Sequence, residues 1–413
     1  MDKKFKILFI TLVCINMLNY LDRYILAAIL EPLGKDLSLN DEQLGRLAFM
    51  FLIVYMCAAP LAGYLSDRMS RTKLVAGGIF LWSIATSSAA LAQNYNSLMF
   101  TRALVGIGEA FFATLGPAIL CDILPQKERA SKFTWFFLAV PVGSALGFGL
   151  GGTLAGIWGW RSSFLIAGIP GLLFAAWMWM QPDPKKGQYD INETDEYSHL
   201  SYFGKLKALL NYPIFLACTA SYVGYTFGMG ALSHWAPTLF QRKYNLSIAQ
   251  AGMVFGGVAV LTGILGTFLG GSLTKKFQDK FPNFGIDFSM ITIILAAPAV
   301  WLVLTATDVN SAYVFLFISM LLLFINTSPV NAETYSSVPS SLRATGAAVN
   351  IFLIHLLGDA LSPGLVGHKS TLLGGDGNAL AEALKMVVIA FIIGGLALLF
   401  ARKKKIKSVG HAV

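Results

Sequence analysis

The first apolar stretch of the chain reads FKILFITLVCINMLNYLDRYILAAIL, residues 5–30, and it contains an aspartate and an arginine side by side. The stretch is long enough to cross a bilayer as one helix, since a span needs roughly 20 apolar residues. Charge at that depth is costly, so it rarely occurs without a partner or a water-filled cavity. The pair Asp22–Arg23 therefore predicts a protein that moves solutes or protons, because a membrane anchor does not need it.

Composition places the whole chain in the same class. Hydrophobic residues make up 55% of the 413 residues and charged residues 13%, whereas soluble domains have about a quarter charged residues. Because the apolar runs are long and continuous, we predict an all-α membrane protein. The net charge of +9 lies at span ends and in short loops, so nucleic-acid binding is not expected. The four cysteines fall singly inside apolar runs, and no metal or cofactor is expected.

Twelve apolar segments are long enough to be spans, which predicts a multi-pass protein of the cell (inner or plasma) membrane. They are residues 6–29, 44–66, 73–93, 97–121, 131–155, 161–181, 212–239, 248–273, 286–305, 311–337, 343–366 and 382–401. Basic residues recur at alternate span ends, which places both termini in the cytoplasm.

A polar break divides the twelve spans into two sets of six. We predict an N-terminal six-helix bundle (1–181), a cytoplasmic linker with a surface helix (182–211), a C-terminal six-helix bundle (212–401) and a basic cytoplasmic tail (402–413). Internal duplication with a site between the halves at mid-membrane is the usual architecture of secondary transporters.

Four charges in the first and fourth spans form the candidate site. Arg102 and Glu109 are seven residues apart, so they share a helix face about 10 Å apart along the axis. Counting the rise from the span ends puts Arg102 near the depth of Asp22, and Glu109 nearer mid-membrane. Asn19 can join the cluster, because it lies three and four residues before the charged pair. We expect Asp22 to pair with Arg102, and Glu109 to be less fully compensated, with Arg23 as its candidate partner.

These residues have distinct expected roles. A carboxyl group in a partly dry cavity can exchange a proton near neutral pH, so Glu109 and Asp22 are the expected proton-coupling residues. Arg23, Arg102 and Asn19 are expected to bind substrate or to complete the charge network. The alternative is a static ion network that locks helices together. Function is favoured, because a purely structural network is costly in lipid.

The second half offers a smaller polar group. His355 and Asp359 are four residues apart in IFLIHLLGDALSP and can meet on one helix face. They are either a second proton site or a structural hydrogen bond, and both interpretations stay open. Asn326 is a further polar residue inside the tenth span.

The stretch GYLSDRMSRTK (63–73) follows the second span and combines a small residue with charges. It is either a plain basic loop or the signature of the major facilitator superfamily, which it resembles closely. That resemblance implies a cytoplasmic latch that stabilises one conformer without touching substrate. The latch residues would be Gly63, Asp67, Arg68 and Arg71, with Asp122 as the candidate partner.

Along nearly its whole length the chain resembles the Spinster family of the major facilitator superfamily. The matching stretches are NYLDRY (19–24), GYLSDRMSR (63–71), RALVGIGEA (102–110), AVPVGSALG (139–147), ALSHWAPTLF (231–240), SLRATGAA (341–348) and HLLGDALSP (355–363). The resemblance implies a lipid transporter with twelve helices in two bundles. Animal relatives export sphingosine-1-phosphate or move lysophospholipids, and proton coupling is proposed for some members. Carried onto this chain, the proton and substrate positions are Asp22, Arg23, Arg102 and Glu109.

The expected function is secondary active transport by alternating access, driven by a proton gradient. The substrate would be a lysolipid or sphingolipid-like anion whose head group meets Arg23 or Arg102, and membrane lipids would be the other partners of a monomer. The alternative is a proton-coupled symporter of small organic anions such as sugar acids. An enzyme is not expected, since the five histidines are scattered and neither HExxH nor GxSxG occurs. A sensor would normally carry an appended soluble domain, and no segment is long enough for one.

Overall fold

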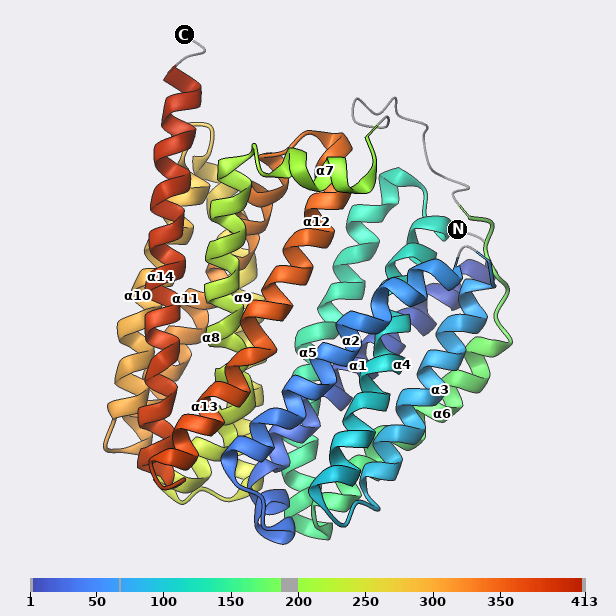
Figure 1. Ribbon diagram of the computed structural model, residues 1–413, viewed down its shortest axis with the longest axis vertical. Helices are drawn as coiled ribbons and strands as arrows, with labels where there is room; N and C mark the ends of the chain where they lie inside the picture. Colours follow the sequence, from blue (N-terminus) through green and yellow to red (C-terminus); the bar gives the residue numbers. More distant parts are fainter. Residues whose placement is uncertain (1–2, 67, 187–199, 411–413) are drawn as a thin grey trace. The chain divides into compact units, whose positions relative to one another are not determined.

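The computed structural model describes residues 3–66, 68–186 and 200–410 (Figure 1). These residues form fourteen α-helices and one π-helical turn, η1. The elements are α1 (Lys3–Leu37), α2 (Asp41–Ser66), α3 (Arg71–Ala89), α4 (Tyr95–Ile123), α5 (Gln126–Trp158), α6 (Trp160–Trp179), α7 (Tyr202–Leu209), α8 (Pro213–Tyr244), α9 (Ile248–Phe277), α10 (Phe284–Thr305), α11 (Val309–Ser336), α12 (Ser340–Ile354), η1 (His355–Asp359), α13 (Leu361–Leu372) and α14 (Gly377–Gly410).

Long apolar helices dominate the described part of the chain, as the sequence predicts. Eleven segments there are long and apolar enough to cross a membrane, and one of them, Thr345–Leu372, runs through α12, η1 and α13. The remaining predicted span, 73–93, forms α3. Its mean hydropathy is lower because it begins with Arg71 and Lys73 and contains polar residues such as Ser83 and Thr86. The all-α membrane fold is confirmed, and the cytoplasmic position of the termini stays a prediction.

The chain forms two compact units. The first comprises Met1–Asn192, Ser233–Val260 and Gly367–Gly377. The second comprises Glu193–Leu232, Leu261–Val366 and Asn378–Val413. Two segments from the second half of the sequence thus belong to the unit that contains α1–α6. These compact units do not test the prediction of two six-helix bundles, 1–181 and 212–401. That assignment stays a prediction.

In the first unit, glycines bring three helices close to the backbone of α4 and α1. A Cβ at Gly106 of α4 would lie 2.5 Å from the Phe51 carbonyl oxygen of α2, and one at Gly108 would lie 2.5 Å from the Gly78 carbonyl oxygen of α3. A Cβ at Gly143 of α5 would lie 2.3 Å from the carbonyl oxygen of Met17 on α1. Larger residues would push these backbones apart. The Gly106 and Gly108 contacts place α2 and α3 close against the part of α4 between Arg102 and Glu109.

In the second unit, α7 is the surface helix expected within 182–211. Figure 1 shows it lying across the ends of α8 and α12. Leu209 of α7 is buried against Phe215, Val338 and Leu342, whereas Phe203 is 80% exposed. The helix is therefore anchored by one apolar face.

Candidate functional site

The charged cluster predicted from the first and fourth spans is present in the first unit. Arg23 of α1 donates to Glu109 of α4 from Nη2 at 2.8 Å and from Nε at 3.2 Å, and both bonds end on Oε2. The Glu109 side chain is fully buried, whereas that of Arg23 is 19% exposed. The expected pairing of Arg23 with Glu109 is confirmed. Of this pair, Arg23 is therefore the residue whose side chain is partly exposed.

Aromatic rings surround the Arg23 guanidinium. Its central carbon lies 5.2 Å from the ring centre of Tyr20, 5.0 Å from that of Phe51 and 5.4 Å from that of Tyr55. Aromatic faces attract a cation at these distances and hold it without neutralising it. The rings therefore help to fix the Arg23 guanidinium in place beside Glu109.

Asp22 has a different partner from the one expected. Its Oδ2 accepts a hydrogen bond of 2.7 Å from the Thr86 hydroxyl of α3. Arg102 attracts Asp22 electrostatically, but the predicted Asp22–Arg102 pair is not formed, and the Nε and Nη2 atoms of Arg102 have no hydrogen-bond partner. The Arg102 guanidinium instead lies 5.4 Å from the ring centre of Phe164 on α6. Glu109 is thus the carboxylate held by an arginine, and Asp22 is held by a hydroxyl.

Several buried atoms of this cluster have unused hydrogen-bonding capacity. Besides the two Arg102 nitrogens, they are Asn19 Nδ2, Asp22 Oδ1 and Glu109 Oε1. Such atoms are rare in native proteins, where buried polar groups usually have a protein, water or ion partner. The cluster can therefore accept protons on its carboxylates and an anion on its guanidinium groups.

The predicted latch lies at one end of the first unit. Arg71 of α3 forms an ion pair with Asp122 of α4, so the expected partner is confirmed. The Arg68 guanidinium lies over the Tyr64 ring at 3.8 Å. Asp67 is outside the described residues. No described atom lies within 4 Å of a Cβ built at Gly63, so this glycine makes no close helix contact.

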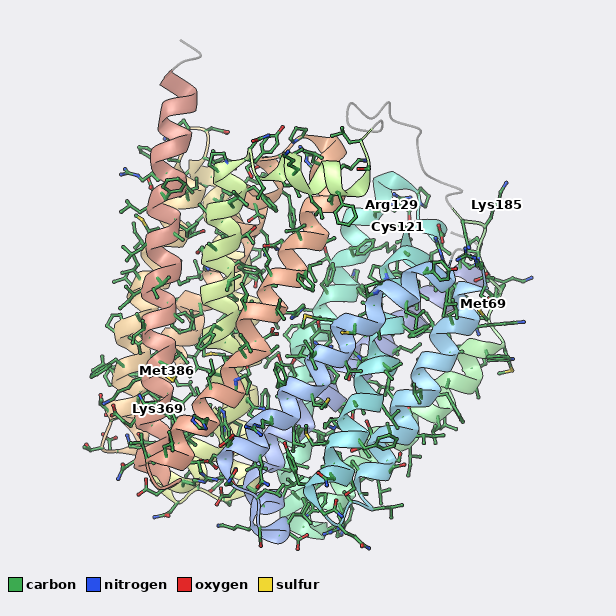
Figure 2. All side chains as sticks on the ribbon, in the orientation of Figure 1. Met69, Cys121, Arg129, Lys185, Lys369 and Met386 are labelled. Carbon is green, nitrogen blue, oxygen red and sulfur yellow. The ribbon has the colours of Figure 1, made fainter. Side chains whose placement is uncertain are left out.

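Backbone contacts tie the same end together. Arg129 of α5 donates from Nη2 to the Cys121 carbonyl oxygen at 2.9 Å, and it thereby caps the end of α4 next to Asp122. Figure 2 shows Arg129, Cys121, Met69 and Lys185 at this end. The Thr72 amide donates to Asp183 at 3.0 Å, which joins α3 to the segment after α6. The latch region is a connected polar layer.

Comparison with known proteins identifies the family. The model of the Major Facilitator Superfamily matches residues 12–363. Protein spinster homolog 1 of Xenopus tropicalis is 33% identical over 379 residues, which cover 87% of this chain and 71% of the relative. Protein spinster homolog 3 of Danio rerio is 33% identical over 376 residues, which cover 86% and 75%. The chain belongs to the Spinster family of the major facilitator superfamily.

Solved structures show the same fold. A bacterial homologue of the human lysosomal transporter Spinster, in an inward-facing and unoccupied conformation, superposes with a TM-score of 0.85 at 22% identity and covers 97% of both chains. A D-xylose–proton symporter superposes with a TM-score of 0.74 at 16% identity, also covering 97% of both chains. This Spinster-family protein is a multi-pass membrane transporter and not an enzyme.

The polar group of the second half lies in the second unit of this transporter. His355 Nδ1 lies 3.0 Å and 3.1 Å from the two carboxylate oxygens of Asp359. The pair begins and ends η1, where the Ala360 amide donates to the His355 carbonyl oxygen and Gly358 leaves helical geometry. Thr226 of α8 donates to the Ile354 carbonyl oxygen at 3.0 Å. π-Helical turns are frequent at functional sites.

Asn326 is fully buried in α11, and neither its side-chain nitrogen nor its side-chain oxygen has a partner. In the described part of the chain no hydrogen bond joins Asn326 to His355 or Asp359, so a combined second polar site stays a prediction. Among the described residues, no group of three or more histidine, cysteine or acidic side chains could hold a metal ion.

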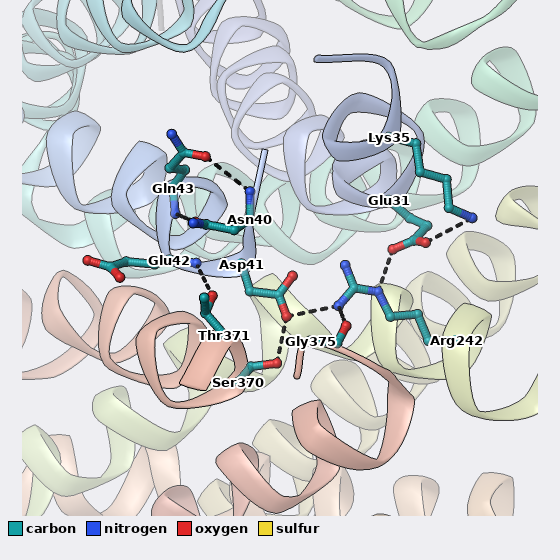
Figure 3. A network of polar contacts seen from close by, with 10 residues as sticks. All are labelled: Glu31, Lys35, Asn40, Asp41, Glu42, Gln43, Arg242, Ser370, Thr371 and Gly375. Atoms are coloured by element: carbon teal, nitrogen blue, oxygen red, sulfur yellow. Dashed lines mark hydrogen bonds and ion pairs between the residues drawn. The ribbon is translucent and has the colours of Figure 1, made fainter. Parts of the chain in front are cut away.

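A second charged network in the first unit was not anticipated from the sequence (Figure 3). Arg242, at the end of α8, forms ion pairs with Glu31 of α1 and Asp41 of α2. The sequence signal was indirect: a basic residue ends the seventh span at the predicted outer side, where the first loop is acidic. Thr86 was also missed, because a hydroxyl in an apolar helix gives no signal of its partner.

Proposed function

We propose that this Spinster-family transporter is a proton-coupled secondary carrier that works by alternating access and moves an amphiphilic anion of the lysolipid or sphingolipid type. One observation carries the proposal: Arg23 is partly exposed, yet its ion-pair partner Glu109 is fully buried. A solute anion can approach the guanidinium, but the carboxylate that competes for it is inside the protein.

The geometry supports coupling between proton and anion. When Glu109 is ionised, its Oε2 occupies the Nε and Nη2 donors of Arg23. When Glu109 takes up a proton, it loses its charge, and those donors become available to a phosphate or carboxylate head group. Proton and anion binding then favour each other, and by linkage each raises the affinity for the other by the same factor. Net movement of both in one direction is the expected consequence.

An amphiphilic substrate suits the surroundings of Arg23. The rings of Tyr20, Phe51 and Tyr55 offer apolar faces beside a cationic centre. A head group can meet the guanidinium while the adjoining hydrocarbon packs on the rings. The resemblance to the Spinster family implies the same substrate class.

Thermal-shift measurements on the purified transporter in nanodiscs test the substrate class. We would compare a single-chain phosphate lipid, the uncharged monoacylglycerol with the same acyl chain, and glucuronate. Stabilisation by the phosphate lipid alone is the expected result. Stabilisation by glucuronate alone would replace the proposal with a symporter of small organic anions. An equal response to monoacylglycerol and phosphate lipid would contradict a role for the charge.

A further inference from the structure

Three polar side chains in the second unit are fully buried and have no hydrogen-bond partner among the described residues. Asn326 of α11 is 0% exposed, and both its amide nitrogen and its amide oxygen are unpartnered. Ser221 of α8 and Ser289 of α10 are also 0% exposed, and their hydroxyl oxygens are unpartnered. Buried polar groups in native proteins usually have a protein or water partner. Because none of the three belongs to the charged cluster around Arg23, the proposed transport chemistry does not account for them.

The two serines differ from other hydroxyl residues in the same helices. Thr226 of α8 and Thr292 of α10 each donate to the carbonyl oxygen four residues earlier, at 3.0 Å. Serine and threonine in a helix can satisfy their hydroxyl group in this way. Ser221 and Ser289 do not make this bond. Their hydroxyls therefore keep both a donor and an acceptor for a partner outside their own helix.

An apolar cluster shows that α8, α10, α11 and α14 pack together close to these residues. Its buried members include one from each helix: Cys218, Ile286, Val330 and Leu398. Ser221 and Ser289 lie three residues after the cluster residue of their own helix, and Asn326 lies four residues before that of α11. Each is therefore one helical turn from the cluster and on the same helix face. Since α11 runs opposite to α8 and α10 (Figure 1), the three residues lie at one height and form a polar layer.

Gly394 of α14 completes this layer. It lies four residues before Leu398, so it is also one turn from the apolar cluster. A Cβ at Gly394 would lie 2.9 Å from the Ser221 carbonyl oxygen and 3.2 Å from Cδ1 of Ile293 on α10. The helices α8, α10 and α14 therefore meet at this height. Because glycine has no side chain, α14 adds no apolar group to the layer at this position.

We infer that Ser221, Ser289 and Asn326 form an internal water site in the core of the second unit. The Asn326 amide offers donors and an acceptor, and each serine hydroxyl offers both functions. Water matches this mixed set, since a buried water typically makes about three hydrogen bonds to otherwise unsatisfied groups. A cation fits less well, because it would use only the oxygens and none of these side chains is a carboxylate that could balance its charge.

The water site gives Asn326 a role separate from that of His355 and Asp359. The bound water joins α8, α10 and α11 by hydrogen bonds at a height where their side chains do not bond to one another directly. It is a neutral contact inside the second unit, whereas Arg23 joins α1 to α4 in the first unit by an ion pair.

A cryo-electron microscopy map of the wild-type transporter in nanodiscs, at a resolution that shows ordered water, tests the site directly. The expected result is solvent density within hydrogen-bond distance of Asn326 and of at least one of the two serines. A layer without such density, or with density that contacts one helix only, would overturn the inference.

Thermal unfolding of variants tests whether these residues share one partner. S289A should lower Tm much less in the N326L background than in the wild type, because N326L has already removed the shared water. The matched control is S319A, whose hydroxyl donates to the Leu316 carbonyl oxygen within α11 at 2.9 Å. Its effect on Tm should be the same in both backgrounds. An equal effect of S289A in both backgrounds would contradict a shared water.

Exchange of the salt distinguishes water from a cation. N326L should leave the difference in Tm between sodium chloride and choline chloride, at equal ionic strength, as it is in the wild type. A stabilisation by sodium that N326L removes would overturn the inference in favour of a cation site. None of these measurements uses a transported substrate or a proton gradient, so failure of the water site and failure of the proposed function give different results.

Discussion

The first unit contains two charged networks that differ in how fully their atoms are partnered. The central cluster of Asp22, Arg23, Arg102 and Glu109 leaves buried oxygens and nitrogens without hydrogen bonds. The network around Arg242 supplies hydroxyls and a backbone carbonyl to its charges. Unused capacity is expensive in a membrane protein, which supports the proposal that this cluster binds a proton and an anion. Full satisfaction indicates a contact whose purpose is to hold helices together.

Arg23 and Arg242, the central arginines of these networks, also differ in how many carboxylate partners they have. Arg23 has one carboxylate partner, Glu109, which has no second charged partner among the described ion pairs. Arg242 has two carboxylates, and each keeps another contact: Glu31 pairs with Lys35 and Asp41 accepts from Ser370. Loss of Arg23 should therefore be felt more strongly than loss of Arg242.

The largest expected effect is on anion binding. R23Q should weaken binding of a single-chain phosphate lipid by about 100-fold or more, because the phosphate head group of the bound lipid loses its charged partner. R161Q, at the exposed Arg161–Asp36 pair, is the matched control and should leave affinity within about twofold. Isothermal titration of the purified variants measures both. Equal losses in the two variants would remove Arg23 from the substrate site.

The next effect is on stability, and it compares the two networks directly. R23Q should lower the free energy of unfolding by about 3 kcal/mol, because Glu109 is left buried without its partner. Adding E109Q should recover most of that loss. R242Q should cost less than R23Q, since Glu31 and Asp41 keep other contacts. Unfolding in mixed micelles gives the order, and a larger loss in R242Q would reverse the comparison.

The smallest expected effect is the loss of unfolding free energy when a single hydroxyl group is removed. T86V removes the hydrogen bond to Asp22 Oδ2, whose neighbour Oδ1 is already unpartnered, and should cost about 2 kcal/mol. S370A removes one of two contacts to Asp41 and should cost about 1 kcal/mol, because Arg242 remains. The same unfolding experiment measures both variants. Equal costs would show that the central cluster is better satisfied than its hydrogen bonds suggest.

The helical framework and one central contact could be predicted from the sequence. Apolar runs place the spans, since lipid leaves the backbone few alternatives. Depth along a helix can be counted from residue numbers, and it brought Arg23 and Glu109 to one cluster. The sequence offered Asp122, at the end of α4, as a partner for the motif at 63–73, and the structure shows that Arg71 is the motif residue that pairs with it.

The remaining contacts depend on geometry that residue counting does not contain. Depth gives the height of a side chain but not the direction in which it leaves the helix, so Arg102 was assigned to Asp22 although Thr86 is the one bonded to it. Glu31 and Asp41, the two carboxylate partners of Arg242, lie 211 and 201 residues before it in the sequence. Only the fold of the first unit, which includes the end of α8 from Ser233 onward, brings them together.

The central claim is that protonation of Glu109 frees Arg23 for an anion. Calorimetric titration with a single-chain phosphate lipid, in two buffers of different ionisation enthalpy, measures the protons taken up on binding. The wild-type transporter should take up as much as about one proton per anion, and E109Q should take up fewer by that amount. Anion binding by the wild type with no more proton uptake than E109Q would contradict the account.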